Sequence, residues 1–402
     1  MPTKKRIYDS LIDEHLSTHR QMLFLSGPRQ VGKTTTCRRH ADAYLNWDNV
    51  DHREIILAGP ERVAAHLGLD RLRERMPVVL FDELHKYPRW KAFLKGFHDT
   101  YADRIRILVT GSSRMDTYRR GGDSLMGRYF HYRMHPFSIA ELLHRELPDP
   151  ARIIRPPRKL PETDMEALWQ FGGFPEPFLK RDARFSRRWQ SLRLDQLVRE
   201  DIRDLTQVQQ LGQIEALIHL LVERSGQQLV YSNLARQIRV SVDTAHRWID
   251  LLCSLHLGFL IRPWYRNVSR SLRKEPKWYL RDWAQARDRG QRAETFVACH
   301  LLKAVEAWTD LGLGKFELGY IRDKNKREVD FIVTRDDTPW FLVEVKHGQA
   351  PLSEALTYFR QQLAAPHAFQ VTLDMPYVKA DCFAKPGAPL IVPARTFLSQ
   401  LL

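Results

Sequence analysis

LFLSGPRQVGKTTT, residues 23–36, is the stretch that decides the fold. Its apolar first part predicts a buried strand, its middle is a glycine-rich turn, and its last part is polar and compatible with a helix. Gly27, Gly32, Lys33 and Thr34 satisfy the pattern G-x-x-x-x-G-K-[ST]. Strand, turn and helix in this order predict a phosphate-binding loop.

The chemistry of such a loop assigns roles to its residues. The two glycines let successive backbone N–H groups face a polyphosphate, and the helix that follows adds its positive end. Lys33 is expected to lie along the β- and γ-phosphates, and the Thr34 hydroxyl to join the shell of a magnesium ion. The expected ATP-binding residues are Gly27, Pro28, Arg29, Gln30, Val31, Gly32, Lys33, Thr34 and Thr35, with Ser112 from a later strand.

Two carboxylates follow the next strong strand signal. Residues 77–90, PVVLFDELHKYPRW, predict a buried parallel strand that ends at Asp82 and Glu83. Open α/β sheets bind their ligands at the carboxyl ends of the strands. Asp82 is therefore expected to hold the magnesium ion through water, and Glu83 to act as the general base on the attacking water.

Two further segments contain candidate catalytic groups. Residues 106–113, RILVTGSS, predict a strand that ends in hydroxyl groups, and Ser112, or else Thr110, could touch the γ-phosphate or the attacking water. The alternative is a turn that only caps this strand. Arg128 follows in MGRYF. It could be an ordinary surface arginine, or it could reach a neighbouring subunit's γ-phosphate as an arginine finger.

Composition indicates the scale of the protein and its partners. The chain has 402 residues, 43% of them hydrophobic, which is enough for a large core in about two to four domains. A net charge of +15 and a pI near 9.7 favour polyanions, so DNA is the expected partner. The four cysteines form no C-x-x-C pair, which argues against a disulfide framework or a zinc knuckle. Without a signal-peptide pattern or a bilayer-spanning run, a cytoplasmic protein with no membrane partner is expected.

Six motifs in order carry a family resemblance. GPRQVGKTT, LFDELHKYPRW, LVTGSS, LMGRYF, HPFSIAEL and GGFPEP together resemble the bacterial and archaeal AAA+-type ATPases that have a DUF4143 C-terminal region. The resemblance covers nearly the whole chain and implies ATP hydrolysis and a homo-oligomer, such as a hexameric ring. It also implies that Arg128 is a finger or sensor acting across a subunit boundary. His85 stands where the family frequently has glutamine, and no role is assigned to it.

The region after this core predicts a linker and helices. Residues 147–212 begin with PDPARIIRPPRKLP, whose prolines exclude a continuous helix. The rest is interpreted as a small helical lid beside the nucleotide, with FGGFPEP as a structural turn. Arginines in residues 186–205 are expected to form a solvated helix face.

Residues 213–286 show a winged-helix pattern. Three helices are predicted, with Ser232 and Ser241 as N-caps of the second and third. Two apolar strands follow, and the basic loop between them, which includes Lys277, predicts a wing that grips phosphates. The alternative is a lid that only packs on protein. The expected DNA contacts are Thr244, Arg247, Arg266, Arg270, Arg273 and Lys274.

Residues 287–402 place four polar residues on α-β-β-β-α patterning. Glu294 lies on the first helix, Asp330 on the second strand, and Glu344 and Lys346 on the third. Because side chains alternate along a strand, Glu344 and Lys346 are expected on the same side. Asp330 and Glu344 could bind magnesium while Lys346 steadies the attacking water or the developing charge.

This order resembles the PD-(D/E)xK nuclease core, although Val329 stands where that core has its proline. The resemblance implies catalytic roles for Glu294, Asp330, Glu344 and Lys346. The alternative is an inactive nuclease fold that serves only for DNA binding or docking.

The predicted fold class is therefore α/β, in four parts. These are a P-loop AAA+ ATPase core (1–146), a linker and helical lid (147–212), a winged-helix domain (213–286) and a nuclease-like PD-(D/E)xK domain (287–402). The predicted function is an ATP-hydrolysing motor that remodels or translocates on DNA, for example at branched or broken ends in repair. Two alternatives stay open: an ATP-regulated DNA nuclease, and an ATP-driven switch whose C-terminal domain binds a protein partner.

Overall fold

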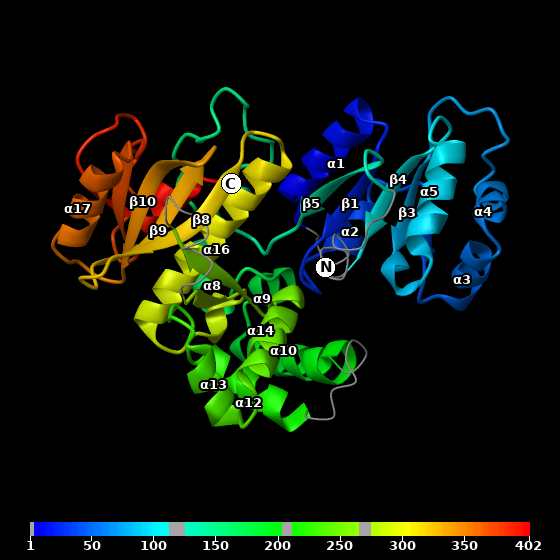
Figure 1. The fold of residues 1–402 in the computed structure, drawn as a ribbon. Coiled ribbons are helices and arrows are strands. Elements are labelled where there is room, and N and C mark those ends of the chain that lie inside the picture. Colours follow the sequence, from blue (N-terminus) through cyan, green and yellow to red (C-terminus); the bar gives the residue numbers. More distant parts are fainter. Residues whose placement is uncertain (1–3, 112–124, 203–210, 265–274) are drawn as a thin grey trace. The chain divides into compact units, whose positions relative to one another are not determined.

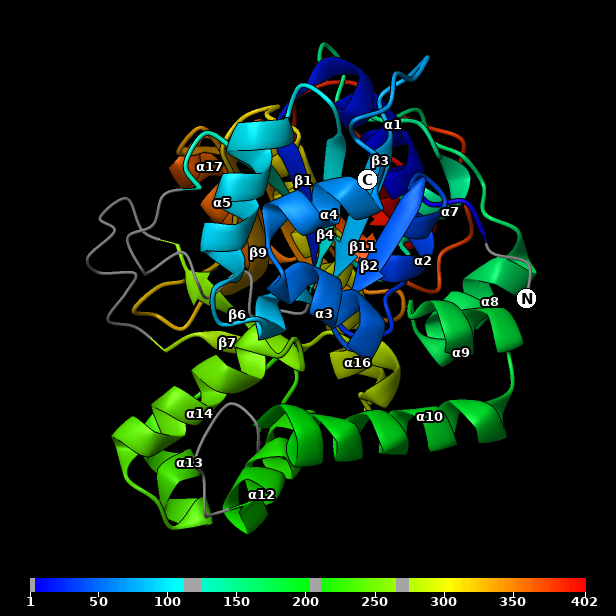
Figure 2. The same ribbon diagram turned by 90° about the vertical axis from the view of Figure 1, so that its right-hand side faces the viewer.

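The computed structural model describes residues 4–111, 125–202, 211–264 and 275–402. The chain forms two compact units, each of which is described by itself (Figures 1 and 2). Unit 1 comprises Met1–His135 and Arg145–Leu147, and unit 2 comprises Pro136–His144 and Pro148–Leu402. Among the described residues, no helix combines the length and the apolar character needed to cross a membrane.

Unit 1 is a parallel sheet with helices packed against it (Figure 1). The strands are β1 (Met22–Ser26), β2 (Ala43–Asn46), β3 (Val78–Asp82), β4 (Arg106–Thr110) and β5 (Tyr129–Arg133), in the order β2-β3-β4-β1-β5. The helices are α1 (Ile7–Thr18), α2 (Lys33–Arg38), α3 (Val50–Leu57), α4 (Pro60–His66), the 3₁₀ turn η1 (Leu84–Lys86) and α5 (Trp90–Tyr101). Since β4 lies between β1 and β3, the segments that follow these three strands leave the sheet at one edge.

The core of unit 1 explains why its central strands are apolar throughout. β1 and β3 are buried at every position, as expected for parallel strands covered on both faces. Phe81 of β3 meets Phe93 and Phe97 of α5 edge-on, with 5.7 Å between ring centroids in each pair. Trp90, Phe93 and Phe97 share one face of α5 because their spacing follows the helical period.

Unit 2 contains a mixed sheet with the strand order β12-β11-β10-β9-β8-β6-β7. Its strands are β6 (Gly258–Pro263), β7 (Lys277–Leu280), β8 (Phe316–Arg322), β9 (Glu328–Arg335), β10 (Thr338–Lys346), β11 (His367–Thr372) and β12 (Leu390–Pro393). Its helical segments are α7 (Ile139–Leu143), α8 (Glu162–Phe171), α9 (Pro175–Lys180), α10 (Ala183–Gln196), the π-helical η3 (Leu197–Ile202), α12 (Leu211–Val222), α13 (Tyr231–Ile238), α14 (Val242–Ser254), η4 (Trp283–Gln285), α16 (Arg289–Asp310), α17 (Glu354–Leu363) and α18 (Ala394–Ser399).

The C-terminal part of unit 2 follows the predicted α-β-β-β-α order. β8 and β9, and then β9 and β10, pair antiparallel, and β10 pairs parallel with β11 after the crossover through α17. α16 and α17 lie on opposite faces of these strands (Figure 1). Leu356 and Phe359 of α17 pack against Ile332 and Leu342 in one apolar cluster. The predicted α/β class is thus confirmed for the described part of the chain.

The hairpin of β6 and β7 differs from the expected wing. β6 pairs antiparallel with β7 and also parallel with β8, through Arg262 opposite Gly319 and Pro263 opposite Tyr320. Both strands therefore extend the C-terminal sheet. Lys277, expected in the basic loop, instead begins β7 and is only 4% exposed. Residues 265–274, where most of the predicted wing lies, are outside the described part of the chain.

Three smaller expectations can also be compared with the structure. The FGGFPEP turn is structural, because a Cβ on Gly173 would lie 2.6 Å from the Phe137 carbonyl oxygen. The solvated arginine face is wrong for Arg193, which is buried with its guanidinium carbon 4.0 Å from the centre of the Phe174 ring. Ser241 caps α14 as predicted, but α13 begins after Val230, so Ser232 is not its N-cap. The helices of the expected lid belong to unit 2.

A buried ion pair anchors the segment 136–144 within unit 2. Lys303 of α16 forms an ion pair with Glu141 of α7, and its Nζ also donates to the Pro136 carbonyl oxygen at 2.9 Å. The Lys303 and Glu141 side chains are 1% and 0% exposed. The neighbouring Ile139 N–H donates to His300 Nε2 at 3.1 Å. Burial lowers the pKa of His300 to about 3, so the ring is neutral and Nε2 can accept this bond.

We expect Lys303→Met to destabilise unit 2 by about 3–5 kcal/mol, because it leaves the Glu141 carboxylate buried without this cation. The double variant Lys303→Met/Glu141→Leu should recover most of that loss, since apolar groups can replace a buried pair at little cost. Calorimetric unfolding of both variants measures the difference. A double variant as unstable as the single one would contradict the assignment.

Candidate functional site

The loop after β1 folds as a phosphate-binding loop. Gly27 and Gly32 adopt positive φ angles of 143° and 102°, which favour glycine. A Cβ on Gly27 would lie 2.3 Å from the Met134 carbonyl oxygen, so the loop packs directly against the chain after β5. Lys33 Nζ donates to the carbonyl oxygens of Gly27 and Pro28, both at 2.8 Å. Burial lowers the pKa of Lys33 to about 8, against the nearby charges of Glu83 and Asp82.

The Asp82 carboxylate is where three strands and the loop meet. It accepts a hydrogen bond from Thr34 Oγ1 at 3.0 Å, from Thr110 Oγ1 at 2.5 Å and from the Tyr44 hydroxyl at 2.9 Å. These donors come from α2, β4 and β2. Asp82 is 5% exposed. Thr34 and Asp82 are oxygen donors of the kind that magnesium prefers, so the site fits a nucleotide-bound magnesium ion.

Glu83 follows Asp82 in an unusual backbone conformation. Its φ is +54°, a value that is uncommon outside glycine and that recurs at active sites. Its backbone N–H donates to the Thr110 carbonyl oxygen at 3.1 Å, which ties it to β4. Its carboxylate lies 3.3 Å from Lys86 Nζ. Glu83 is therefore held beside the Asp82 carboxylate at the edge of the sheet where the loop lies.

The remaining residues predicted for this site differ in burial and in position. Pro28 and Val31 are buried, whereas Gln30 and Thr35 are exposed, and Ser112 lies outside the described residues. Arg128 lies just before β5, and the first residue of β5 pairs with Met22 at the start of β1. The Arg128 guanidinium forms an ion pair with Asp99 at 2.6 Å. Since the phosphate-binding loop follows the other end of β1, Arg128 is not at the nucleotide site of its own chain.

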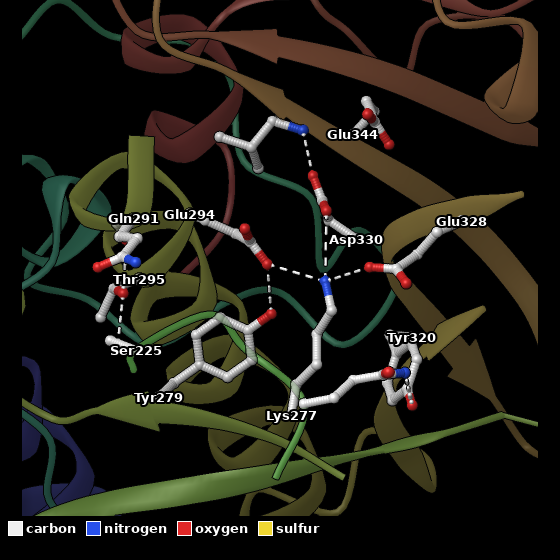
Figure 3. Close-up of polar contacts among 12 residues, drawn as sticks. Ser225, Lys277, Tyr279, Gln291, Glu294, Thr295, Tyr320, Glu328, Asp330 and Glu344 are labelled. Atoms are coloured by element: carbon white, nitrogen blue, oxygen red, sulfur yellow. Dashed lines mark hydrogen bonds and ion pairs between the residues drawn. The ribbon is translucent and has the colours of Figure 1, made fainter. Parts of the chain in front are cut away.

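A second polar cluster lies in unit 2, around Lys277 (Figure 3). Lys277 Nζ is 3.1 Å from Glu294 Oε1, 2.7 Å from Glu328 Oε1 and 3.5 Å from Asp330 Oδ1. The Tyr279 hydroxyl donates to Glu294 Oε1 at 2.6 Å. The structure thus gathers Glu294 and Asp330, as their order in the sequence predicts, but around an ammonium group that the sequence analysis assigned to a wing.

Glu344 and Lys346 border the same cluster. Lys346 Nζ donates to Glu344 Oε1 at 2.8 Å, in agreement with their expected position on one side of β10. The backbone N–H of Val345 donates to Asp330 Oδ2 at 2.8 Å. Glu344 is 8% exposed, and its Oε2 is buried without a hydrogen-bond partner.

The cluster perturbs the acidity of its carboxyl groups. Burial raises the pKa of Glu294 and of Glu344 to about 7, and the charge of Asp330 adds to the rise in both. For Lys277, burial opposes the charge, but the surrounding carboxylates raise its pKa well above the usual value. The ammonium group therefore stays charged.

The cluster does not fit the magnesium ion that the nuclease resemblance implies. In the part of the chain that the structure describes, no group of three or more His, Cys, Asp or Glu side chains is placed to hold a metal ion. Lys277 lies among the carboxylates instead. We therefore assign no metal-dependent step to this cluster.

Two of the predicted DNA contacts lie in the described chain. Arg247 is exposed in the first half of α14. The backbone N–H of Thr244 donates to the Ser241 hydroxyl at 3.1 Å, so this residue forms part of the helix cap. Arg266, Arg270, Arg273 and Lys274 lie outside the described residues.

Sequence reasoning missed three residues that shape the two clusters. Tyr44 and Tyr279 each donate to a carboxylate, and Glu328 contacts Lys277. One signal in the sequence could have placed two of these residues. Side chains two residues apart on a strand point to the same face of the sheet, which applies to Lys277 with Tyr279 and to Glu328 with Asp330.

Comparisons with known proteins match the chain in three segments. Residues 19–143 match a family described as AAA domain, residues 162–287 a domain of unknown function (DUF8612), and residues 289–379 another domain of unknown function (DUF4143). The chain thus combines an AAA-type ATPase domain with a DUF4143 region, as the motifs indicate. The second match spans both the expected lid and the expected winged helix.

Three similar curated proteins are described as uncharacterized. Proteins of Mycobacterium bovis and Mycobacterium tuberculosis are each 25% identical over 266 residues, which is 65% of this chain and 54% of theirs. A protein of Methanocaldococcus jannaschii is 22% identical over 310 residues, covering 68% of this chain and 64% of its own. The chain thus spans about half the length of the mycobacterial relatives. The solved structure of Caenorhabditis elegans PCH-2 is 16% identical over 34% of this chain and 41% of that chain, with a TM-score of 0.23.

We expect Gly27→Ala to lower stability and nucleotide affinity strongly, because its methyl group would overlap the Met134 carbonyl oxygen. The matched control is Gly59→Ala, which also introduces a side chain at positive φ but has no heavy atom within 4 Å of the new Cβ. Melting temperatures and binding of a fluorescent ATP analogue compare the two. Equal losses in both variants would show that backbone strain, not the contact with Met134, is decisive.

The raised pKa of Glu344 also predicts a pH effect. The unfolded chain releases this proton near pH 4.5 and the folded chain near pH 7, so this group makes folding less favourable as pH rises between these values. We expect Glu344→Gln to reduce the loss of stability between pH 5 and pH 8, and the exposed Glu215→Gln to leave it unchanged. Urea midpoints at both pH values test this. An unchanged pH dependence in Glu344→Gln would be inconsistent with the raised pKa.

Proposed function

We propose that this chain binds ATP with magnesium at the loop after β1 and hydrolyses it. The observation that carries the proposal is the hydrogen bond from Thr34 Oγ1 to Asp82, 3.0 Å long. It joins the magnesium-binding hydroxyl of the loop to the carboxylate at the end of β3, so both ligands belong to one site. The AAA domain match over residues 19–143 supports the same activity.

In this proposal each residue has a distinct task. Lys33 neutralises the β- and γ-phosphates, which replace the loop carbonyl oxygens as its partners. Asp82 holds the magnesium ion, and Glu83 accepts the proton of the attacking water. We propose that Arg128 acts on the nucleotide of a neighbouring subunit in a homo-oligomer, because it lies at the end of β1 away from its own phosphate-binding loop.

DNA is the partner that we propose for the ATPase cycle, in remodelling or translocation. The net charge of +15 supports a polyanionic partner. In unit 2, α10 presents exposed arginines at 184, 187 and 188, a spacing that puts them on one side of the helix, and α14 presents Arg247. Such side chains bind phosphates without reading sequence.

One observation favours a second candidate function, the ATP-driven switch with a protein partner. The exposed surface of α14 also carries Asp243 and Asp250, and Asp250 pairs with His246 at 3.1 Å. A recognition helix with two carboxylates on its exposed surface is less suited to the phosphates of a groove than a uniformly basic one. This candidate predicts ATP turnover that does not respond to DNA.

Phosphate release with magnesium, with and without DNA, tests the proposal. Lys33→Ala should lose nucleotide binding, and Glu83→Gln should bind ATP but hydrolyse it about 10²–10⁴-fold more slowly, the usual effect of removing a general base. Lys95→Ala on α5 is the matched lysine control. Normal turnover by Glu83→Gln would refute the role of Glu83.

Duplex, single-stranded and branched DNA are then compared as activators, at two salt concentrations. We expect stimulation that falls as salt rises, because each phosphate contact releases counterions. Replacing the arginines at 184, 187, 188 and 247 by alanine should reduce the stimulation without changing basal turnover. Turnover that is the same with every DNA would favour the protein-partner switch.

A further inference from the structure

The Lys277 ammonium lies where the carboxylates of unit 2 converge (Figure 3). Its three partners come from two elements, Glu294 from α16 and Glu328 and Asp330 from β9, and all three oxygen atoms are within 3.5 Å of Nζ. The face of the Tyr320 ring lies 5.5 Å from the same atom. Carboxylates from separate elements around one point make a cation site, and here the cation is part of the chain.

We propose that Lys277 occupies this cation site permanently, so that the DUF4143 region works without a divalent metal ion, and that removing its ammonium group uncovers a latent metal site. This inference does not depend on the proposed ATPase. It excludes a metal-dependent nuclease step at this cluster.

The surroundings of Lys277 keep its side chain in place. The side chain is 5% exposed, and the following residues of β7, Trp278 and Tyr279, are fully buried. The Trp278 carbonyl oxygen also accepts a hydrogen bond from the Gly226 N–H at 2.7 Å. To admit a metal ion the lysine would have to leave, and its charge would then lose three carboxylate partners in a buried position.

The partners of the carboxylates support the same assignment. Asp330 Oδ2 accepts from the Val345 N–H at 2.8 Å and Glu294 Oε1 accepts from Tyr279, so both groups are oriented toward Lys277 by a second bond. Glu344 Oε2 is different, because it is buried and has no partner. Without the lysine, the oxygens of Glu294, Glu328 and Asp330, which surround Nζ at 2.7–3.5 Å, would be left to close on a cation. Carboxylate oxygens are the ligands that manganese and magnesium prefer.

Manganese binding by the full chain, free of nucleotide, tests the inference. Electron paramagnetic resonance counts free Mn²⁺ at increasing protein concentration for wild type, Lys277→Met and Lys277→Met/Asp330→Asn. We expect Lys277→Met to bind one more Mn²⁺ per chain than wild type, and the double variant to lose it. Mn²⁺ should also raise the melting temperature of Lys277→Met more than that of wild type. Mn²⁺ bound at the ATPase site contributes equally to all three proteins and cancels in the comparison.

Asp330→Asn in the otherwise native chain keeps the test decisive if Lys277→Met does not fold. The inference predicts that this variant binds as much Mn²⁺ as wild type. A loss of one bound Mn²⁺ in Asp330→Asn would overturn it, because the native site would then hold a metal ion. Magnesium-dependent cleavage of end-labelled DNA by wild type, abolished in Asp330→Asn, would overturn it as well.

Discussion

The parallel pairing of β4 between β1 and β3 is the constraint on which the ATP site depends. Leu23 of β1 lies opposite Leu108 of β4, and Leu80 of β3 pairs with the same residue from the other side. In this register the phosphate-binding loop after β1, the Thr110 hydroxyl at the end of β4 and the Asp82 carboxylate at the end of β3 lie at the same edge of the sheet. Thr110 can then donate to Asp82, and Asp82 can also accept from Thr34. A strand moved by one residue would turn these side chains to the other face.

The site in unit 1 could be predicted from the sequence because its chemistry is local. The glycine spacing of the loop and the two acids after an apolar strand are short patterns with a direct physical reason. The role of Tyr44 could not be read in this way, because the hydroxyl reaches Asp82 only through the pairing of β2 with β3. The position of Arg128 could not be predicted either. It lies just before β5, and only the register of β5 with β1 shows that this is the end of β1 away from the phosphate-binding loop.

In unit 2 the three predicted helices and the α-β-β-β-α order agree with the structure. The elements β11, β12 and α18 and the partners of the hairpin were not predicted. An apolar strand, a basic loop and a second apolar strand describe both a wing and two strands at the edge of a larger sheet. Only the pairing of Arg262 with Gly319, 57 residues away in the sequence (319 minus 262), distinguishes them. That pairing brings Lys277 to the carboxylates, so its expected and observed partners have the same negative charge but belong to different molecules: DNA in the prediction, this chain in the structure. A lysine expected to bind phosphate is an internal counterion, and a site expected to need a metal ion already contains a cation.

The chain passes from unit 1 to unit 2 between His135 and Pro136, and both sides of this point are held firmly within their own unit. Met134 lies against the phosphate-binding loop through its contact with Gly27, and its N–H donates to Ser26 at 2.8 Å. Pro136, two residues later, is held in unit 2 by Lys303 of α16. The same helix carries Glu294 near its start, in the Lys277 cluster. The ion pair of Lys303 and Glu141 thus fixes the first segment of unit 2 to the helix that also carries Glu294.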